Sequence, residues 1–381
     1  MLSALAPPVR AAPHTPSDDA TVIERLPFRA ADATARELAA LRATVAAQPS
    51  DQAAAVELAQ KYFDLAMARG DPRYVGYADA IVGGFSRPLS APVLLVRGTL
   101  RQYRHDFSGA LADYAAALEL DADLAGAHAW RGAIYLVEAD YAAAAKECAA
   151  LQKLGRSVLF GGCRGLTLAY TGHLAQAYQT LQQALAASRD DDHRLWLHTR
   201  LGEVAAWQGQ FATAERHYRQ ALAIGRDDGY LLAAWCDFLL DRGRPAEVVD
   251  QLAAWESSDG LLLRLAEAET RLGLPAATAH RQALDDRFAA ARLRGDTTHR
   301  AEEARFYLRL KNDAQTAVAL AAENYRVQKE PRDARVLLEA ARAAGDAGAA
   351  RPVLDWLQTS GFEDGGLRQL ARQLSQPRVA R

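Results

Sequence analysis

Residues 98–110 read GTLRQYRHDFSGA, and residues 132–144 read GAIYLVEADYAAA. The two stretches share a glycine, an aspartate, an aromatic residue and an alanine at one fixed offset of 34 residues. Gly98, Asp106, Phe107 and Ala110 recur as Gly132, Asp140, Tyr141 and Ala144. A period of this length is typical of stacked helix–turn–helix units, none of which can bury its apolar face alone. The repeat therefore predicts an all-α protein, built as an α-solenoid.

The composition agrees with an array of helices. Half of the 381 residues are hydrophobic, chiefly alanine and leucine, which are strong helix formers. Because each unit of a solenoid touches only its neighbours, we expect one elongated body rather than two or three compact domains. The net charge of −2 comes without a basic cluster, which argues against a nucleic-acid partner. No apolar run approaches the length needed to cross a bilayer.

The most complete unit spans residues 195–228 and resembles the tetratricopeptide repeat. That family places a small residue at position 8, glycine near position 15, an aromatic residue at position 17 and alanine at positions 20 and 27. Those positions are filled here by Gly202, Gly209, Phe211, Ala214 and Ala221. The unit departs from the family at Ala205, where an aromatic residue is usual, and at Arg226, where proline is usual.

The same frame continues in both directions and divides the chain. It predicts about eight units, with an insertion of three residues in the polar loop at 189–193 and a longer second helix at about 276–294. We expect a disordered or processed segment at 1–28, helices with a divergent repeat at 29–90, and well-formed repeats at 91–260. Divergent repeats then fill 261–364, and a capping helix and tail fill 365–381. The resemblance implies a right-handed superhelix with a concave groove.

The resemblance also implies which side chains face the groove, because the first helix of each repeat lines it. The groove positions hold many aromatic and charged residues: Trp130, Tyr170, Trp196, Arg200, Glu203, Trp207, Tyr230, Asp237, Arg264, Glu267, Arg271, Arg335 and Glu339. Tryptophan, tyrosine and arginine often dominate the energetics of protein interfaces. We therefore predict that the groove holds a partner peptide or protein.

A second interpretation of these residues stays open. Arg200 precedes Glu203 by three positions, and Arg264 precedes Glu267 by three, so each pair shares one helix face. Arg335 and Glu339 are four apart and share a face in the same way. Such pairs can be ordinary helix salt bridges, and the tryptophans can be residues that pack one repeat against the next.

The sequence predicts a non-enzymatic protein-interaction scaffold or adaptor that assists the assembly or regulation of a complex. No metal-binding spacing, phosphate-binding loop or nucleophile motif is present, so we expect no catalytic residue, metal or cofactor. Two alternatives remain: a self-associating structural component of an envelope complex, and an enzyme with an unrecognised site. The identity of the partner and the oligomeric state are left open.

The cysteines bear on the compartment. The tetratricopeptide frame puts Cys148 and Cys163 on helices that pack together, which predicts a disulfide in an exported protein and two buried thiols in a cytoplasmic one. Cys236 falls at a position for a small buried residue. The composition is typical of a bacterial source. The small residues among 1–16 resemble the stretch after a signal peptide, which favours the periplasm over the cytoplasm, with a plain disordered tail as the alternative.

Overall fold

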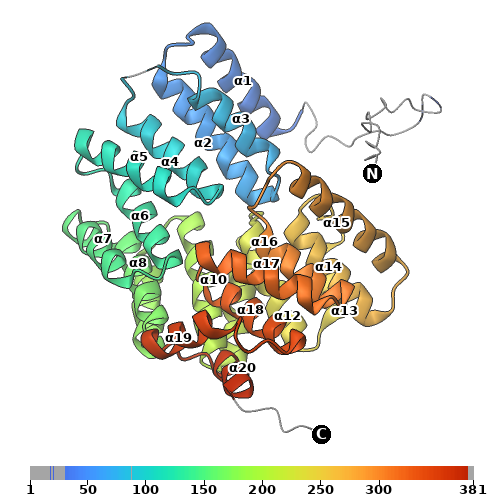
Figure 1. Ribbon diagram of the computed structural model, residues 1–381. Coiled ribbons are helices and arrows are strands. Elements are labelled where there is room, and N and C mark those ends of the chain that lie inside the picture. The colour runs from blue at the N-terminus through green and yellow to red at the C-terminus, as the bar shows by residue number, and fades with distance from the viewer. Residues whose placement is uncertain (1–17, 19, 21–30, 87, 376–381) are drawn as a thin grey trace, which may run out of the picture.

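The structure, a computed structural model, describes residues 18, 20, 31–86 and 88–375. Over these residues the chain forms 20 α-helices and no strand, which confirms the all-α prediction (Figure 1). The predicted N-terminal segment 1–28 lies outside the described residues except at positions 18 and 20, and so do residues 376–381 of the predicted tail.

Three helices precede the repeats: α1 (Ala33–Ala47), α2 (Gln52–Arg69) and α3 (Arg73–Val82). Eight antiparallel pairs follow and confirm the predicted number of repeats. They are α4 (Ala91–Tyr103) with α5 (Phe107–Leu120), α6 (Ala125–Val137) with α7 (Tyr141–Lys153), α8 (Ser157–Tyr170) with α9 (Leu174–Ala187), α10 (Asp191–Trp207) with α11 (Phe211–Leu222), α12 (Gly229–Asp241) with α13 (Pro245–Leu252), α14 (Asp259–Leu272) with α15 (Ala276–Leu293), α16 (Arg300–Phe306) with α17 (Ala314–Val327), and α18 (Pro331–Ala344) with α19 (Arg351–Ser360). A π-helical turn, Tyr307–Lys311, extends α16, and α20 (Gly365–Ser375) follows the last pair.

The turn inside each pair has the same backbone conformation. The first helix ends one or two residues before a residue with positive φ, which reverses the chain in a short space. These residues are His105, Ala139, Gly172, Gly209, Gly243, Gly273, Asn312 and Gly345. In the first two pairs an aspartate then caps the second helix: Asp106 accepts the Gly109 amide at 3.0 Å, and Asp140 accepts the Ala143 amide at 2.9 Å. The repeated Asp–aromatic pair of the sequence is thus a helix start.

The repeated glycine of the first helix allows close packing within a pair. A Cβ atom on Gly98 would lie 2.5 Å from the Tyr114 ring, and one on Gly202 would lie 2.9 Å from the Tyr218 ring. In the fifth pair Cys236 takes this position and is fully buried. The small residue is therefore required by the crossing of the two helices.

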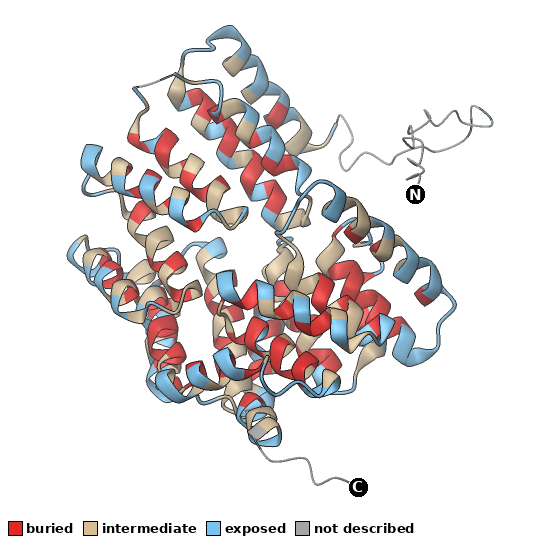
Figure 2. Cartoon of the chain, in the orientation of Figure 1, coloured by how far each residue is buried: buried red, intermediate tan, exposed pale blue. Residues whose placement is uncertain are grey.

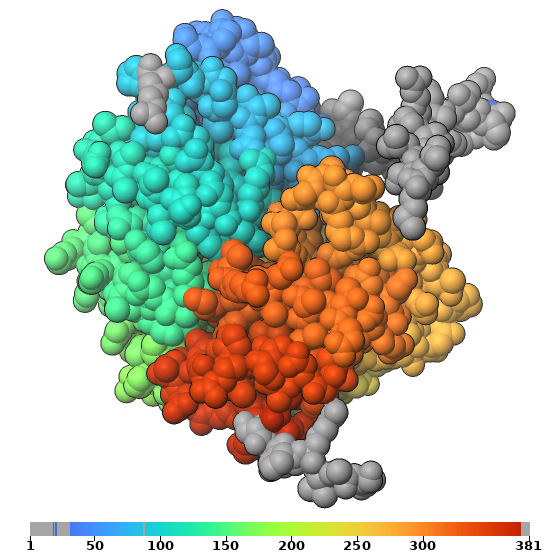
Figure 3. All heavy atoms as spheres, in the orientation of Figure 1, coloured from blue at the N-terminus to red at the C-terminus, as the bar shows by residue number. Residues whose placement is uncertain are grey.

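The array curls until its last helices return to its first half, so the expectation of an elongated body is wrong. The Lys329 amide donates to the carbonyl of Val137 at 2.8 Å, across the space between α17 and α6. Glu363 accepts the Leu174 amide at 2.9 Å, across 189 residues of sequence. Figure 3 shows the C-terminal helices lying against the surface of the first repeats. A small rotation per repeat, summed over the array, brings distant units into contact.

The main core crosses this contact. Buried side chains of α8 and α10 share one apolar cluster with those of α17, α18 and α19. Figure 2 shows buried residues concentrated between the facing helices, with exposed residues on their outer sides. Phe362, which follows α19, is fully buried in this cluster. The closed arrangement determines which of the predicted groove residues remain accessible.

Candidate functional site

The charged residues of the predicted groove come together on the inner face of the curl. Arg200 pairs with Glu203 at 2.9 Å, as their spacing predicts. The guanidinium of Arg200 lies 4.2 Å from the ring centre of Tyr230, whose hydroxyl donates to Glu203 at 2.6 Å. The ring centre of Trp196 lies 6.0 Å from the same guanidinium. Successive repeats therefore share one local network.

The next network differs from the predicted one. Arg264 bonds not to Glu267 but to Asp237 of the preceding repeat, at 2.7 Å. Glu267 is held instead by Arg305 at 2.5 Å, and Arg305 also reaches Asp237 at 2.7 Å. Burial alone would raise the pKa of Asp237, but the two guanidinium groups outweigh it and hold that pKa well below its ordinary value. These charges therefore pair between neighbouring repeats rather than within one helix.

The last members of the predicted groove are also engaged with the chain. Arg335 pairs with Glu339 at 3.0 Å, as predicted, and with Asp241 of α12 at 2.7 Å. Arg309 is the second partner of Glu339. Arg271, which is exposed, donates to the carbonyl of Leu240 at 2.7 Å. The inner face is therefore largely neutralised by its own pairs.

The predicted aromatic residues contact other parts of the chain. The ring of Trp207 lies 5.2 Å from that of Phe362, and the ring of Tyr170 lies 6.2 Å from it. Trp130 packs edge-on against Phe63 of α2 at 6.3 Å. Tyr170 is buried. These contacts belong to the packing of repeats against one another, and binding of a partner by these residues stays a prediction.

The structure joins Cys148 of α7 and Cys163 of α8 by a disulfide, with 5.5 Å between their Cα atoms. Cys236 is free and fully buried, and burial raises the pKa of its thiol to about 12. A thiol held protonated in this way is a poor nucleophile. Cys236 therefore serves as a packing residue.

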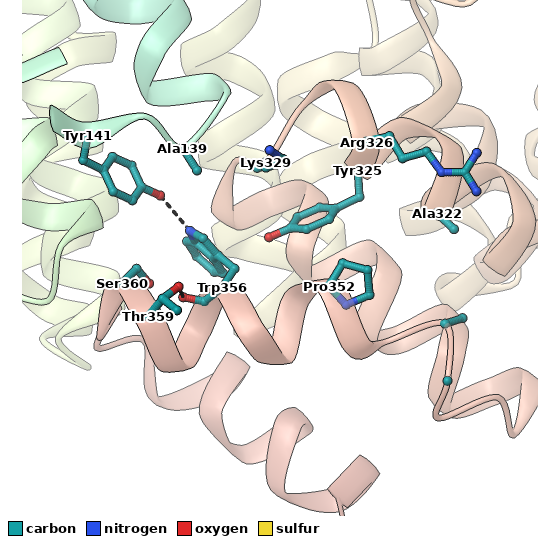
Figure 4. Close-up of a pocket in the computed structure, with 12 residues that line it drawn as sticks. Ala139, Tyr141, Ala322, Tyr325, Arg326, Lys329, Pro352, Trp356, Thr359 and Ser360 are labelled. Atoms are coloured by element: carbon teal, nitrogen blue, oxygen red, sulfur yellow. Dashed lines mark hydrogen bonds between the residues drawn. The ribbon is translucent and has the colours of Figure 1, made fainter. Parts of the chain in front are cut away.

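An open cleft lies where the C-terminal helices meet the start of α7, with a volume of about 780 Å³ (Figure 4). Its walls come from the α6–α7 turn, the end of α17, and α19 with the loop before it. The lining residues are Ala139, Tyr141, Ala322, Tyr325, Arg326, Lys329, Gly348, Ala349, Pro352, Trp356, Thr359 and Ser360. The indole N–H of Trp356 donates to the Tyr141 hydroxyl at 2.7 Å and fixes both rings.

A second hollow of about 400 Å³ lies next to this cleft. Arg326 and Lys329 line both hollows, and the second also contains His105, Phe107 and Glu138. The Lys329 ammonium donates to the carbonyl of Glu138 at 3.2 Å. We call the two hollows together the α7–α17 furrow.

The sequence gives almost no sign of this furrow. Its residues come from segments near positions 105, 139, 326 and 356, which only the closure of the array brings together. Tyr141 is recognisable in the sequence as a repeat residue, but nothing in the repeat frame pairs it with Trp356. Knowledge of the superhelical pitch would be needed to find the site.

Other kinds of site receive no support within the described part of the chain. No group of three or more His, Cys, Asp or Glu residues there is arranged to hold a metal ion. Among the same residues, no helix is both long and apolar enough to cross a membrane.

Comparison with known proteins bears on the fold only. No family model and no curated protein matches the sequence. Solved structures that are similar include the P58(IPK) TPR domain, at 14% identity and a TM-score of 0.23, with 82% of this chain and 94% of that chain covered. The Cut9–Hcn1 hetero-tetramer of the APC/C matches at 14% identity and a TM-score of 0.32, covering 90% and 80%. Naa15/Naa10 bound to HypK-THB matches at 14% identity and a TM-score of 0.30, covering 90% and 63%.

These likenesses are too distant to carry an argument, and the chain's own features decide the matter. Eight helix pairs follow one another. The turn in each pair contains a residue with positive φ, and a small residue lies where the helices of the best repeats cross. The fold is an array of helix pairs similar to tetratricopeptide repeats.

Proposed function

We propose that this chain is a protein-interaction scaffold that binds a partner polypeptide and so assists the assembly or regulation of a complex. The α7–α17 furrow is the observation that carries the proposal. It is preformed, open to solvent, and lined by tryptophan, tyrosine and arginine, the residue types that most often anchor protein interfaces. A preformed site spares a partner much of the entropic cost of ordering its receptor.

The inner face supports the proposal in another way. Its arginines are held by carboxylates from neighbouring repeats, so the charges cross-link the array. A partner that bound there would have to replace bonds such as that between Arg264 and Asp237, at 2.7 Å. The furrow demands no such exchange. We therefore assign the inner face a role in keeping the furrow in shape.

Site-specific photo-cross-linking in the native cell tests the proposal. A photoreactive residue at Thr359 or Pro352, both exposed in the furrow, should give the same discrete adduct with one partner protein. The same residue at Gln282, exposed on α15, is the matched control and should not give that adduct. An adduct at exposed Arg271 but not in the furrow would place the partner on the predicted inner face instead. No adduct at any of these positions would contradict the scaffold proposal.

A further inference from the structure

The charge of the main cleft is one-sided. Among the described residues that line it are two cations, Arg326 and Lys329, and no carboxylate. Arg326 is exposed, and no ion pair or hydrogen bond of its guanidinium is found in the described part of the chain. On the inner face, by contrast, Arg305 is held by two carboxylates. Arg326 therefore presents positive charge that is not paired among the described residues, whereas Lys329 interacts with the nearby carboxylate of Glu138.

The cleft also contains an unused hydrogen-bond donor. Tyr325 is only 3% exposed, and its hydroxyl has no hydrogen-bond partner among the described residues. Figure 4 shows that hydroxyl pointing across the cleft toward Trp356. A buried hydroxyl without a partner costs about 1–3 kcal/mol, which a ligand oxygen within reach would recover. Burial raises the pKa of the Tyr325 hydroxyl, so it stays protonated and can donate.

The apolar part of the cleft is rigid. The Trp356 indole is tied through its N–H to Tyr141 and packs against Phe362, so only a small part of its ring, 6% exposed, faces the cleft. Pro352 and Ala349 complete this surface on the same side. A rigid aromatic surface beside two cations suits an apolar side chain next to a carboxylate.

The shape favours an extended chain over a compact small molecule. The main cleft of about 780 Å³ and the second hollow of about 400 Å³ share Arg326 and Lys329 as lining residues. The second hollow contains Asp106 and Glu138, so its chemistry differs from that of the first. An extended peptide can place different side chains in the two hollows.

We propose that the α7–α17 furrow binds an extended, acidic segment of a partner protein, with a carboxylate at Arg326 and an apolar side chain beside Pro352 and Trp356. This inference rests on the proposed scaffold function and names the chemistry of the partner. The segment beyond the cations, facing Asp106 and Glu138, is neutral or basic. Recognition then depends on charge order along the peptide as well as on total charge.

Selection from a phage-displayed library of random peptides tests this chemistry on the full chain. Selected peptides should be enriched in Asp and Glu beside Phe, Leu or Trp. A synthetic copy of the strongest peptide should bind about tenfold more weakly when its acidic residues become amides, and binding should weaken as salt is raised. Fluorescence anisotropy of the labelled peptide gives these affinities.

Matched variants separate the site from general charge effects. Arg326→Glu with Lys329→Glu should abolish binding, and Arg326→Ala alone should weaken it about tenfold. The control reverses two exposed cations elsewhere, Arg281→Glu with Lys153→Glu, and should bind as the parent does. Circular dichroism shows whether each variant is folded.

Three results would overturn the inference. They are selection of no peptide, selection of peptides without acidic residues, and equal binding by the folded charge-reversed variant. If neutral peptides bind and lose affinity on Pro352→Glu, the furrow still binds a partner and only the charge assignment fails. Failure of the scaffold function itself would show separately, as absence of the photo-adduct.

Discussion

At the scale of one residue, Ala139 shows that the turn of a repeat accepts a residue with a side chain where glycine is favoured. Its φ is 62°, in the left-handed region where most pairs of this chain have glycine. A Cβ atom there costs about 1 kcal/mol. Ala139→Gly should therefore raise the free energy of unfolding by about 1 kcal/mol, measured by urea denaturation. Gly209→Ala is the converse control: no atom lies within 4 Å of the added Cβ, so the loss it shows reflects backbone strain alone.

Gly98 tests the requirement for a small residue at the helix crossing. An added Cβ would lie 2.5 Å from the Tyr114 ring, which is fully buried and cannot withdraw. Gly98→Ala should destabilise the chain by roughly 1–3 kcal/mol. Gly76→Ala, in α3, meets no atom within 4 Å and should instead be stabilising by up to about 1 kcal/mol. Equal effects of the two variants would refute the close-packing argument.

His217 should make stability depend on pH. Burial, with His198 and Arg216 nearby, lowers its pKa to about 4 from an ordinary 6.5. Its Nδ1 lies 3.1 Å from that of His198, an arrangement that suits neutral rings. The unfolded chain binds the proton more readily, so this stability is complete above about pH 6.5 and is lost as pH falls toward 4. Urea denaturation should show a loss of roughly 2–3 kcal/mol, which His217→Gln should largely remove.

At the scale of the element, the repeat frame predicted the helices well and the ion pairs only in part. The second helix expected at about 276–294 is observed as α15, Ala276–Leu293. Its ends could be predicted because glycine and proline in the sequence mark helix ends. The spacing left open a pair between Arg264 and Glu267, and Arg264 pairs instead with Asp237 of the neighbouring repeat. Spacing along one helix carries no information about the neighbouring helix. For this reason the spacing could not predict the pair between Arg264 and Asp237.

The network between α12, α14 and α16 predicts a large effect of one arginine. Arg305→Met would leave the carboxylate of Glu267, only 3% exposed, without its cation. Removing one partner of a buried ion pair costs about 3–5 kcal/mol. Arg281→Met, on the exposed face of α15, should change stability by less than about 0.5 kcal/mol. Thermal unfolding of both variants checks the difference, and similar midpoints would contradict the assigned role.

The link between α7 and α8 is tested by counting thiols. With Cys148 and Cys163 joined, the denatured, unreduced protein should show one free thiol, that of Cys236. The loop closed by the bridge spans 15 residues, so reduction should lower stability by about 3 kcal/mol in the chain-entropy model. Three free thiols would contradict the disulfide.

At the scale of the whole molecule, closure of the array determines which surfaces a partner can reach. The all-α fold and its eight pairs could be predicted, because they rest on local spacing. The furrow could not be predicted, because Tyr141 and Trp356 are 215 residues apart. They meet only because the small rotations between successive repeats add up along the array. Small errors in rotation per repeat grow with their number. The site therefore depends on a property that no single repeat encodes.

Closure is the central claim, and hydrogen exchange at two amides tests it most directly. The amides of Lys329 and Leu174 bond across the contact, to Val137 and Glu363. Leu174 begins α9, where an amide normally has no partner within its helix. We predict that both amides exchange far more slowly than exposed helix-start amides, and that Phe362→Ala, which removes a fully buried side chain from the contact, speeds both. Exchange of both amides at the unprotected rate in the parent protein would contradict the closed array and the furrow that depends on it.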